Sequence, residues 1–184
     1  MPDLTSFWIS FRVALISTMI VTIFGILISK WLYNKNRYWV NLLESFIILP
    51  IVLPPTVLGF ILLIIFSTRS PVGEFFTNIL HLPVVFTLTG AVIASVIVSF
   101  PLMYQHTVNG FRSIDSKMLN TARTMGASET KIFLKLVLPL SKRSILAGIM
   151  MSFARAIGEF GATLMVAGYI PDKTNTLPLQ IYFL

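Results

Sequence analysis

The strongest constraint on this chain is that it contains four apolar stretches long enough to cross a bilayer. They cover roughly 7–33, 44–66, 84–104 and 145–168. A helix needs about 20 mostly apolar residues to span the hydrocarbon core. Only 11% of the residues are charged, against about 25% in a soluble domain. We therefore predict an all-α, polytopic membrane protein. After Pro178 the chain reads LQIYFL, which we interpret as the start of a fifth span that is cut short.

Lysine and arginine are distributed unevenly among the loops that join these runs. The loop after the first run holds Lys30, Lys35 and Arg37, and the stretch from about 107 to 143 holds Arg112, Lys117, Arg123, Lys131, Lys135, Lys142 and Arg143. The loops on the opposite side hold only Arg69 and Lys173. Because short cytoplasmic loops are enriched in these residues, we predict an external N-terminus and a cytoplasmic loop at 107–143. The net charge of +7 then reflects topology, which argues against a nucleic-acid partner.

The chain contains no cysteine and only two histidines, His81 and His106, far apart in the sequence. This composition excludes a disulfide framework and a cysteine-based metal or haem site, and we expect neither a bound metal nor another cofactor. The first apolar run is too long for a cleavable signal peptide, and Asp3 precedes the first basic residue. We therefore expect this run to stay in the membrane.

The cytoplasmic stretch has the pattern of two short amphipathic helices joined at a glycine. Apolar residues recur at helical spacing, first as Ile114, Met118, Ala122 and Met125 and then as Ile132, Phe133, Leu136 and Val137. Asp115 or Ser113 is expected to cap the first helix. Gly126 is expected to end that helix, because a helix C-terminus often requires a positive φ angle.

The second of these helices is expected to begin after Ser128 as its cap, with Glu129 in the first turn and Pro139 at its end. Three interpretations of such a hairpin are open. In the first, the hairpin lies on the lipid surface with its lysines near anionic headgroups. In the second it binds DNA as a helix-turn-helix, and in the third it docks into a groove of a cytoplasmic partner. A DNA-reading module this short and this close to the membrane is disfavoured, so the pattern leaves the surface and docking hypotheses.

The run NTARTMGASETKIFLKLVLP, residues 120–139, resembles the EAA loop of ABC importer permeases. Ala122, Gly126, Leu138 and Pro139 match that motif in place, whereas Asn120 and Thr121 depart from its first two letters. The resemblance implies that the loop sits in a cleft of a separate ATP-hydrolysing subunit. The residues implicated in this coupling are Ala122, Gly126, Ala127, Ser128, Glu129, Phe133, Leu138 and Pro139. The sequence has no G-x-x-x-x-G-K-[ST] run, so we expect another chain to hydrolyse any ATP.

The fourth apolar run carries two ionisable residues, Arg155 and Glu159, four positions apart and so on one helical face. Ionisable side chains at membrane depth are costly and usually face protein or a water-filled path. One interpretation is a neutralised ion pair that fixes helix packing or a helix end. The other is that Arg155 lines an anion path and Glu159 tunes or latches it. The sequence leaves both open.

The same run resembles the molybdate permeases. Residues 154–163 match the family segment Ala-Arg-Ala-x-Gly-Glu-Phe-Gly-Ala-Thr, residues 167–171 match Ala-Gly-x-Ile-Pro, and residues 176–182 match Thr-Leu-Pro-Leu-x-Ile-Tyr. The stretch LPIVLPPTVLGF, residues 49–60, is similar to the proline-rich run of that family. Sulfate permeases share the Arg-Ala-x-Gly-Glu-aromatic-Gly part, so it is the continuation that favours molybdate.

The resemblance implies the permease subunit of an ATP-driven ABC importer with about five core spans. Residues 1–184 would form one transmembrane domain that carries molybdate or tungstate, with sulfate or thiosulfate as the alternative cargo. It also implies a homodimer in a prokaryotic plasma or inner membrane, a cytoplasmic ATP-binding subunit and an external or periplasmic oxyanion-binding protein. Two other classes are weaker. A passive anion channel leaves the two-helix loop unexplained, and a membrane enzyme using Glu159 or Asp172 lacks a paired acid, a nucleophile or metal ligands.

The second run contains Pro50, Pro54 and Pro55, which are expected to kink or break it. Proline removes a backbone donor and clashes with the preceding turn. Broken helices at membrane depth are tolerated where they are buried in protein or line a cavity. Our hypothesis is that this break lines the translocation pathway or its gate. The predicted pathway residues are Pro54, Pro55, Thr56, Arg155, Glu159 and Thr163.

Overall fold

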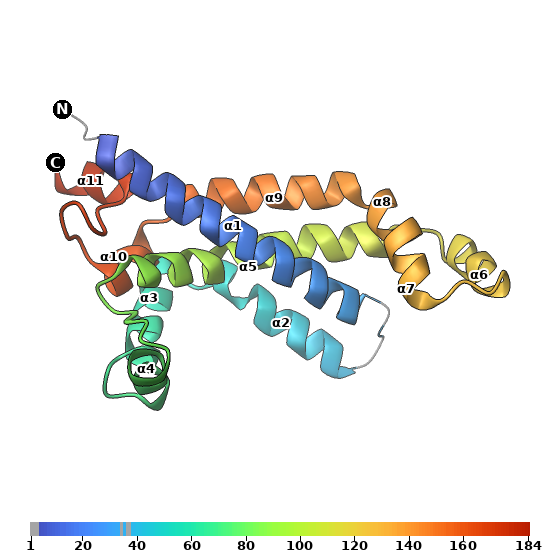
Figure 1. Cartoon of the computed structure of the whole chain (residues 1–184), viewed down its shortest axis with the longest axis horizontal. Helices are drawn as coiled ribbons and strands as arrows, with labels where there is room; N and C mark the ends of the chain where they lie inside the picture. Colours follow the sequence, from blue (N-terminus) through green and yellow to red (C-terminus); the bar gives the residue numbers. More distant parts are fainter. Residues whose placement is uncertain (1–3, 34, 36–37) are drawn as a thin grey trace.

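The computed structural model describes residues 4–33, 35 and 38–184, and every regular element in these ranges is a helix. In chain order the elements are α1 (Leu4–Leu32), α2 (Tyr38–Val52), α3 (Pro55–Ile65), α4 (Pro71–Glu74), η1 (Phe75–Ile79), α5 (Leu88–Arg112), α6 (Ser116–Thr124), α7 (Glu129–Ile132), η2 (Phe133–Val137), α8 (Leu138–Leu140), α9 (Lys142–Ile157), α10 (Gly161–Ala167) and α11 (Leu177–Phe183). The segments η1 and η2 are π-helical turns. The molecule is elongated, with α11 and the start of α1 at one end and α6 to α8 at the other (Figure 1). The predicted all-α class is confirmed.

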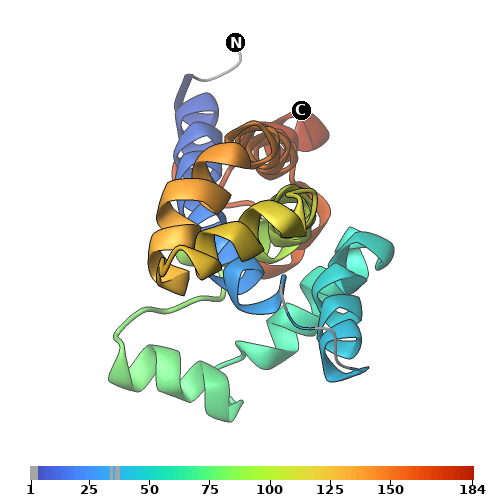
Figure 2. The ribbon, with the colours of Figure 1, turned by 90° about the vertical axis from the view of Figure 1, so that its right-hand side faces the viewer.

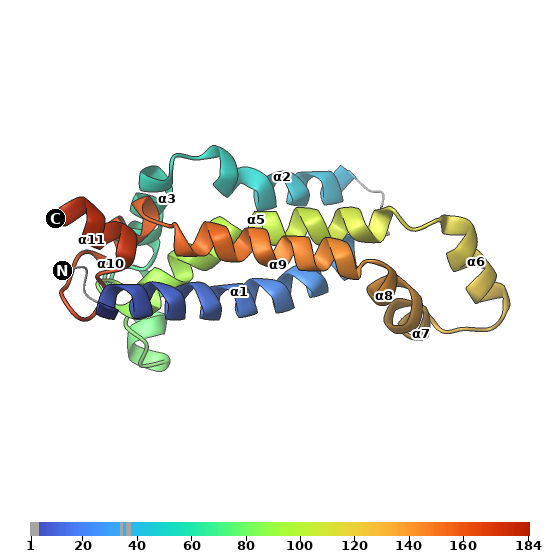
Figure 3. The ribbon, with the colours of Figure 1, turned by 90° about the horizontal axis from the view of Figure 1, so that it is seen from above.

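Three long helices, α1, α5 and α9, lie side by side and form the centre of the molecule (Figure 3). Their contact faces carry small polar residues. The hydroxyl of Ser17 in α1 donates to the carbonyl of Val13 at 2.7 Å and lies 3.3 Å from the carbonyl of Val92 in α5. Ser152 in α9 donates to the carbonyl of Ser99 in α5 at 3.3 Å. Such small residues let helices approach closely inside a membrane.

Helices α1 and α5 are each long and apolar enough to cross a bilayer, and the described residues give up to four spans if each of two bent helix pairs counts as one. These two helices confirm the first and third predicted runs. The third starts later than predicted, at Leu88, because the hydroxyl of Thr87 accepts a hydrogen bond from the N–H of Gly90 at 3.3 Å and caps the helix. It also continues past the predicted end, through to Arg112.

The second predicted run is broken into two helices. Helix α2 ends at Val52, α3 begins at Pro55, and the two helices are bent by 113°. Pro54 adopts an extended backbone with φ −55° and ψ 134°, and neither proline of the pair can donate to a preceding turn. Pro50, by contrast, lies inside α2 without ending it. We call residues 53–55 the proline break. The sequence predicted a kink or a break, and the structure has a break.

The fourth predicted run also consists of two helices, which corrects the prediction of one continuous span. Helix α9 ends at Ile157, α10 begins at Gly161, and the pair is bent by 57°. A side-chain hydrogen bond of Glu159 lies at this bend. Its carboxylate accepts a hydrogen bond from the backbone N–H of Ala162 at 2.8 Å. This bond satisfies one of the N–H groups that a new helix leaves without an intrahelical partner, so it stabilises the start of α10.

Helices α2, α3 and α4 lie to one side of the packed helices (Figure 2). The only buried residue among those of α2 is Val40, and Trp39 and Phe46 are exposed. Polar contacts hold this helix to α5. The carboxylate of Glu44 accepts from the Tyr104 hydroxyl at 2.8 Å and pairs with Arg112 at 2.5 Å. The remaining apolar surface of α2 is suited to contact lipid or another protein.

Candidate functional site

The predicted helical hairpin is present at one end of the molecule, and we call residues 113–141 the α6–α8 loop. The Oδ1 atom of Asp115 accepts from the N–H of Lys117 at 2.8 Å and caps α6. Gly126 has a φ angle of +80°, which glycine adopts without a side-chain penalty. The hydroxyl of Ser128 accepts from the N–H of Lys131 at 3.4 Å and opens α7. The glycine turn and the Ser128 cap are confirmed, and Asp115 is the cap of the first helix.

Pro139 does not end the second helix, contrary to the prediction. The π-helical turn η2 follows α7, and the N–H of Leu138, the residue directly after η2, bonds to the carbonyl of Phe133, five residues earlier. Pro139 then lies in the first turn of α8, where a missing N–H is tolerated. The helical path therefore continues to Leu140 and turns at Ser141 into α9.

The inner face of the α6–α8 loop belongs to the core of the protein. Phe133 is buried, and its ring contacts that of Phe111 edge to face with centroids 5.5 Å apart. Phe111 makes a similar contact with Tyr33 at 5.6 Å. Leu119 and Ile132 are buried in the same cluster. Phe133, one of the predicted coupling residues, therefore anchors the loop to α1 and α5. The predicted residues Ala122, Ala127 and Leu138 are partly buried against the same cluster.

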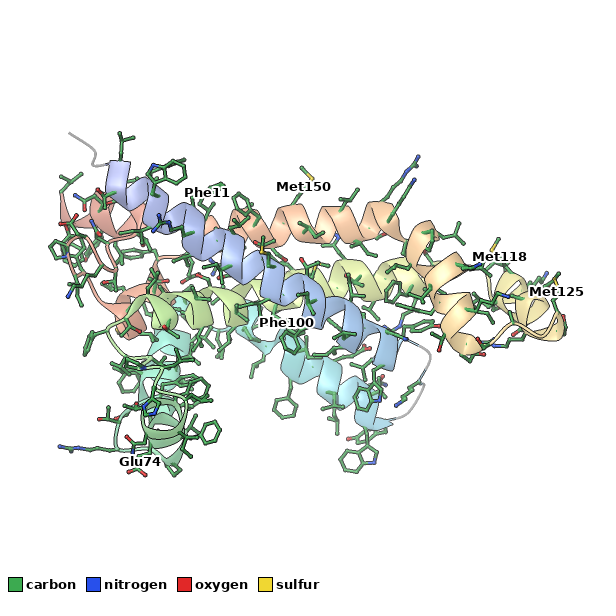
Figure 4. The ribbon with its side chains drawn as sticks, viewed as in Figure 1. Phe11, Glu74, Phe100, Met118, Met125 and Met150 are labelled. Atoms are coloured by element: carbon green, nitrogen blue, oxygen red, sulfur yellow. The ribbon has the colours of Figure 1, made fainter. Side chains whose placement is uncertain are left out.

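The outer face of the loop presents apolar side chains that were not among the predicted coupling residues. Met118 and Met125 lie at the far end of the loop (Figure 4), and Met125 is 82% exposed. Leu134 and Leu140 are exposed as well. Helical spacing identifies Met118 and Met125 as apolar positions of the hairpin, but it does not tell which apolar positions the core covers. Of the predicted residues, those at the surface are Gly126, Ser128, Glu129 and Pro139.

An ion pair connects α6 and α7, the helices on either side of Gly126. The Nε atom of Arg123 lies 2.6 Å from one carboxylate oxygen of Glu129, and its Nη2 atom lies 3.2 Å from the other. This paired hydrogen bond holds the pKa of Glu129 below its usual value and raises the pKa of Arg123. Because the pair is largely exposed, it contributes little to stability. Its two-pronged geometry does specify how α6 is oriented against α7.

The second group of predicted residues lies at the bend between α9 and α10. The Nη1 atom of Arg155 donates to the carboxylate of Glu159, whose other oxygen accepts from Ala162. The Glu159 side chain is only 1% exposed, whereas that of Arg155 is 32% exposed. The carboxylate is thus held between the ends of two helices, and the guanidinium is partly accessible.

The accessible part of Arg155 lines a cavity of about 150 Å³. The other lining residues come from the end of α2, from the proline break and from α5, and they are Pro50, Ile51, Leu53, Pro55, Val98 and Leu102. The structure therefore brings Arg155 and Pro55 to one cavity. Pro54 and Thr56, the sequence neighbours of Pro55, are exposed, and Thr163 is buried in α10. These three lie outside the described lining of this cavity.

Close backbone packing holds α10 against α3. A Cβ atom added at Gly161 would lie 2.8 Å from the Cβ of Pro55, and one added at Gly59 would lie 2.7 Å from the Cα of Ala162. Both distances are shorter than a normal contact, so a larger residue at either glycine would separate the two helices. The proline break and the Arg155–Glu159 pair are therefore joined through α10.

Comparison with known proteins agrees with this architecture. The family model described as "Binding-protein-dependent transport system inner membrane component" matches residues 9–183. The chain is 47% identical to YvgM, a predicted molybdenum transport system permease protein of Bacillus subtilis, over 95% of this chain and 77% of the relative. It is 35% identical to the molybdenum transport system permease protein ModB of Azotobacter vinelandii, over 98% of this chain and 80% of the relative.

A more distant relative is named for a different anion. The chain is 31% identical to a predicted sulfate transport system permease protein of Chlorokybus atmophyticus, over 97% of this chain and 62% of the relative. The match to the family model extends over nearly the whole chain and includes both the α6–α8 loop and the two bent helix pairs. The chain therefore belongs to the family of binding-protein-dependent transport system inner membrane components, which are membrane permease subunits.

Proposed function

We propose that this chain is the permease subunit of an ATP-driven importer for molybdate or a similar tetrahedral oxyanion. The similarity to permeases named for molybdenum transport supports the cargo, because it extends over nearly the whole chain. The observation that carries the proposal is the pairing of two features. One is an exposed two-helix loop at one end, and the other is a broken-helix cavity that contains Arg155. A passive channel would not require the exposed two-helix loop, because it has no ATP-hydrolysing partner to bind.

In this proposal the α6–α8 loop is cytoplasmic, the N-terminus is external, and a separate ATP-binding subunit docks on the outer face of the loop. The uneven distribution of lysine and arginine supports this orientation. Exposed apolar side chains on the loop supply the contact surface: Met118, Met125, Leu134 and Leu140. An external oxyanion-binding protein meets the opposite end, near α11. The exposed apolar face of α2 and α3 packs against a second copy, which gives a homodimer around a shared pathway.

Helix α9 connects the two sites. It begins directly after the α6–α8 loop, and Arg155 lies in its last turn. Its 16 residues extend for about 24 Å at 1.5 Å per residue. A displacement of the α6–α8 loop therefore moves the whole of α9, including the Arg155–Glu159 pair at its end. Helix α10, which is bonded to Glu159 and packed against α3, transmits this displacement to the proline break. ATP binding and hydrolysis in the partner subunit would open the pathway alternately to the outside and to the inside.

Arg155 provides the positive charge that an oxyanion needs. A guanidinium carries five N–H donors, and the described hydrogen bond to Glu159 uses Nη1. Other donors can therefore bind an anion that enters the cavity. Between transport events Glu159 keeps the guanidinium paired, which matters because an unpaired charge at membrane depth is costly. Pro55, which lines this cavity, is a candidate gate residue together with its neighbours Pro54 and Thr56 and with Thr163 in the neighbouring helix α10.

The test is uptake of radiolabelled molybdate into vesicles that contain the chain, its ATP-binding subunit and its binding protein. We expect ATP-dependent accumulation, with competition by tungstate. Arg155→Gln is expected to lower uptake about tenfold or more, which is the effect of losing one hydrogen bond to a charged group. Arg155→Lys should retain part of the activity because the charge remains. Uptake that continues without ATP would indicate a passive channel, and accumulation of sulfate alone would reassign the cargo.

A further inference from the structure

Exposed tryptophans mark two levels along α1. Trp8 is 54% exposed near its start and Trp31 is 57% exposed near its end. At 1.5 Å per residue the two positions lie about 35 Å apart along the helix, slightly more than the roughly 30 Å of the hydrocarbon core. Tryptophan is enriched where membrane meets water. In a bilayer this spacing would put Trp31 at the level of the lipid headgroups, on the side of the α6–α8 loop.

A cleft of about 390 Å³ opens at this level, between the end of α1 and α7. Its lining residues are Leu27, Lys30, Trp31, Tyr33, Lys35, Glu129, Thr130 and Phe133. We call it the headgroup-level cleft. An exposed apolar row on α1, formed by Ile23 and Leu27, leads from the cleft toward the middle of the membrane. The cleft thus joins a polar rim to an apolar strip.

The rim of the cleft carries two ammonium groups. The Nζ atom of Lys30 lies 4.5 Å from the centroid of the Phe133 ring, and that of Lys35 lies 4.0 Å from the Trp31 ring. Within the described part of the chain, neither lysine forms an ion pair with a carboxylate. Glu129 also lines the cleft, but its carboxylate already binds Arg123 at 2.6 Å. Among the described residues, no carboxylate is therefore paired with either lysine.

We propose that the headgroup-level cleft binds the phosphate of an anionic phospholipid, with Lys30 and Lys35 beside the phosphate and an acyl chain along Ile23 and Leu27. The cationic rim fits a negatively charged phosphate, and basic pockets between helices at the membrane surface are suited to such lipids. The apolar strip favours a lipid over a free anion, because a soluble anion has no apolar part that could contact the strip. Since the cleft is formed by both α1 and α7, the bound headgroup holds the α6–α8 loop to the membrane surface.

The test uses the fluorescence of Trp31 in the full chain. Trp8→Phe and Trp39→Phe leave Trp31 as the single tryptophan, since the chain has three. The protein is placed in vesicles that contain either brominated phosphatidylglycerol or brominated phosphatidylcholine, and quenching gives the relative association constant. We expect about a fivefold or greater preference for phosphatidylglycerol, the contribution of about one lysine near an anionic surface.

Variants separate the cleft from the general charge of the protein. Lys30→Gln with Lys35→Gln should remove the preference, and Lys30→Arg with Lys35→Arg should keep it. The matched control is Arg69→Gln with Lys173→Gln, which removes the same number of charges far from the cleft and should keep it too. Lys35 is exposed and lies outside any helix, so Lys35→Gln alone should fold normally and still lower the preference.

Added inorganic phosphate or molybdate, at constant ionic strength, distinguishes a lipid from a soluble anion. We expect the preference for phosphatidylglycerol to survive both additions. Its disappearance would mean that a soluble anion occupies the cleft, and the proposal would be wrong. Equal quenching by the two lipids, or a preference that persists after both lysines are removed, would overturn it as well. These readouts need neither ATP nor transport, so they are independent of the proposed cargo.

Discussion

Gly126→Val is expected to lower coupled anion uptake about tenfold or more while ATP hydrolysis by the associated subunit continues. Gly126 has a φ angle of +80°, and this backbone conformation raises the free energy of an ordinary L-residue by roughly 1–2 kcal/mol. The cost is larger for a β-branched residue, so the turn between α6 and α7 would change its conformation. No described atom lies within 4 Å of a Cβ added at this position. The effect would therefore come from the backbone and not from crowding inside the chain.

The control for this prediction is Gly126→Asn, because asparagine tolerates the left-handed conformation at the end of a helix. It should retain most of the uptake. Both variants are measured in vesicles that report ATP hydrolysis and molybdate accumulation from the same sample. Normal coupled transport by the Gly126→Val protein would contradict a role of this turn in coupling.

Glu159→Ala is expected to destabilise the protein by about 1.5–3 kcal/mol, the usual effect of losing a hydrogen bond to a charged group, because Arg155 is partly accessible and solvent can compensate its charge. The Glu159 side chain is 1% exposed, and its two oxygens bind Arg155 and the N–H of Ala162. Removing them leaves a charge and a helix N-terminus without partners. Glu159→Gln should be milder, because its amide oxygen can still accept from Ala162. Thermal unfolding of the purified protein in detergent measures the difference.

The matched control is Glu74→Ala, which removes an exposed carboxylate from α4 (Figure 4) and should leave the melting temperature almost unchanged. A second comparison separates the pair from the helix end. Arg155→Gln combined with Glu159→Gln should cost less than the sum of the two single changes, because residues in contact are coupled. If Glu159→Ala melted at the same temperature as Glu74→Ala, the Arg155–Glu159 pair would have no structural role.

Features that depend on local chemistry could be predicted from the sequence. The length and apolar composition of α1 and α5 identified them as spanning helices. The side chains of Asp115 and Ser128 compete with solvent for backbone N–H groups in their own first turn, so their positions as caps follow from residue type. Gly126 and the pair Pro54–Pro55 restrict the backbone at their own positions. In these cases few distant contacts are needed to explain the observed conformation.

Features that depend on tertiary contacts were missed. Helix α10 packs against α3 where Gly59 meets Ala162, and a hydropathy pattern, which treats 145–168 as one run, contains no information on this contact. The two glycines on either side of Glu159 and Phe160 were the available signal for a break. The burial of Phe133 could not be predicted either, because amphipathic spacing shows that a helix has an apolar face but not what covers it. Its contact with Phe111 in α5 joins positions that lie far apart in the sequence.

Contact between the α6–α8 loop and an ATP-hydrolysing subunit is measured most directly by crosslinking from position 125. The chain has no cysteine, so Met125→Cys introduces a unique thiol to which a photoreactive benzophenone can be attached. In the assembly purified from native membranes, we expect a crosslink to a P-loop ATPase. Asp172→Cys, between α10 and α11 at the opposite end, should give none. If position 125 in a transport-competent assembly crosslinked only to lipid or to the chain itself, the loop would not be the coupling element and the proposed function would be contradicted.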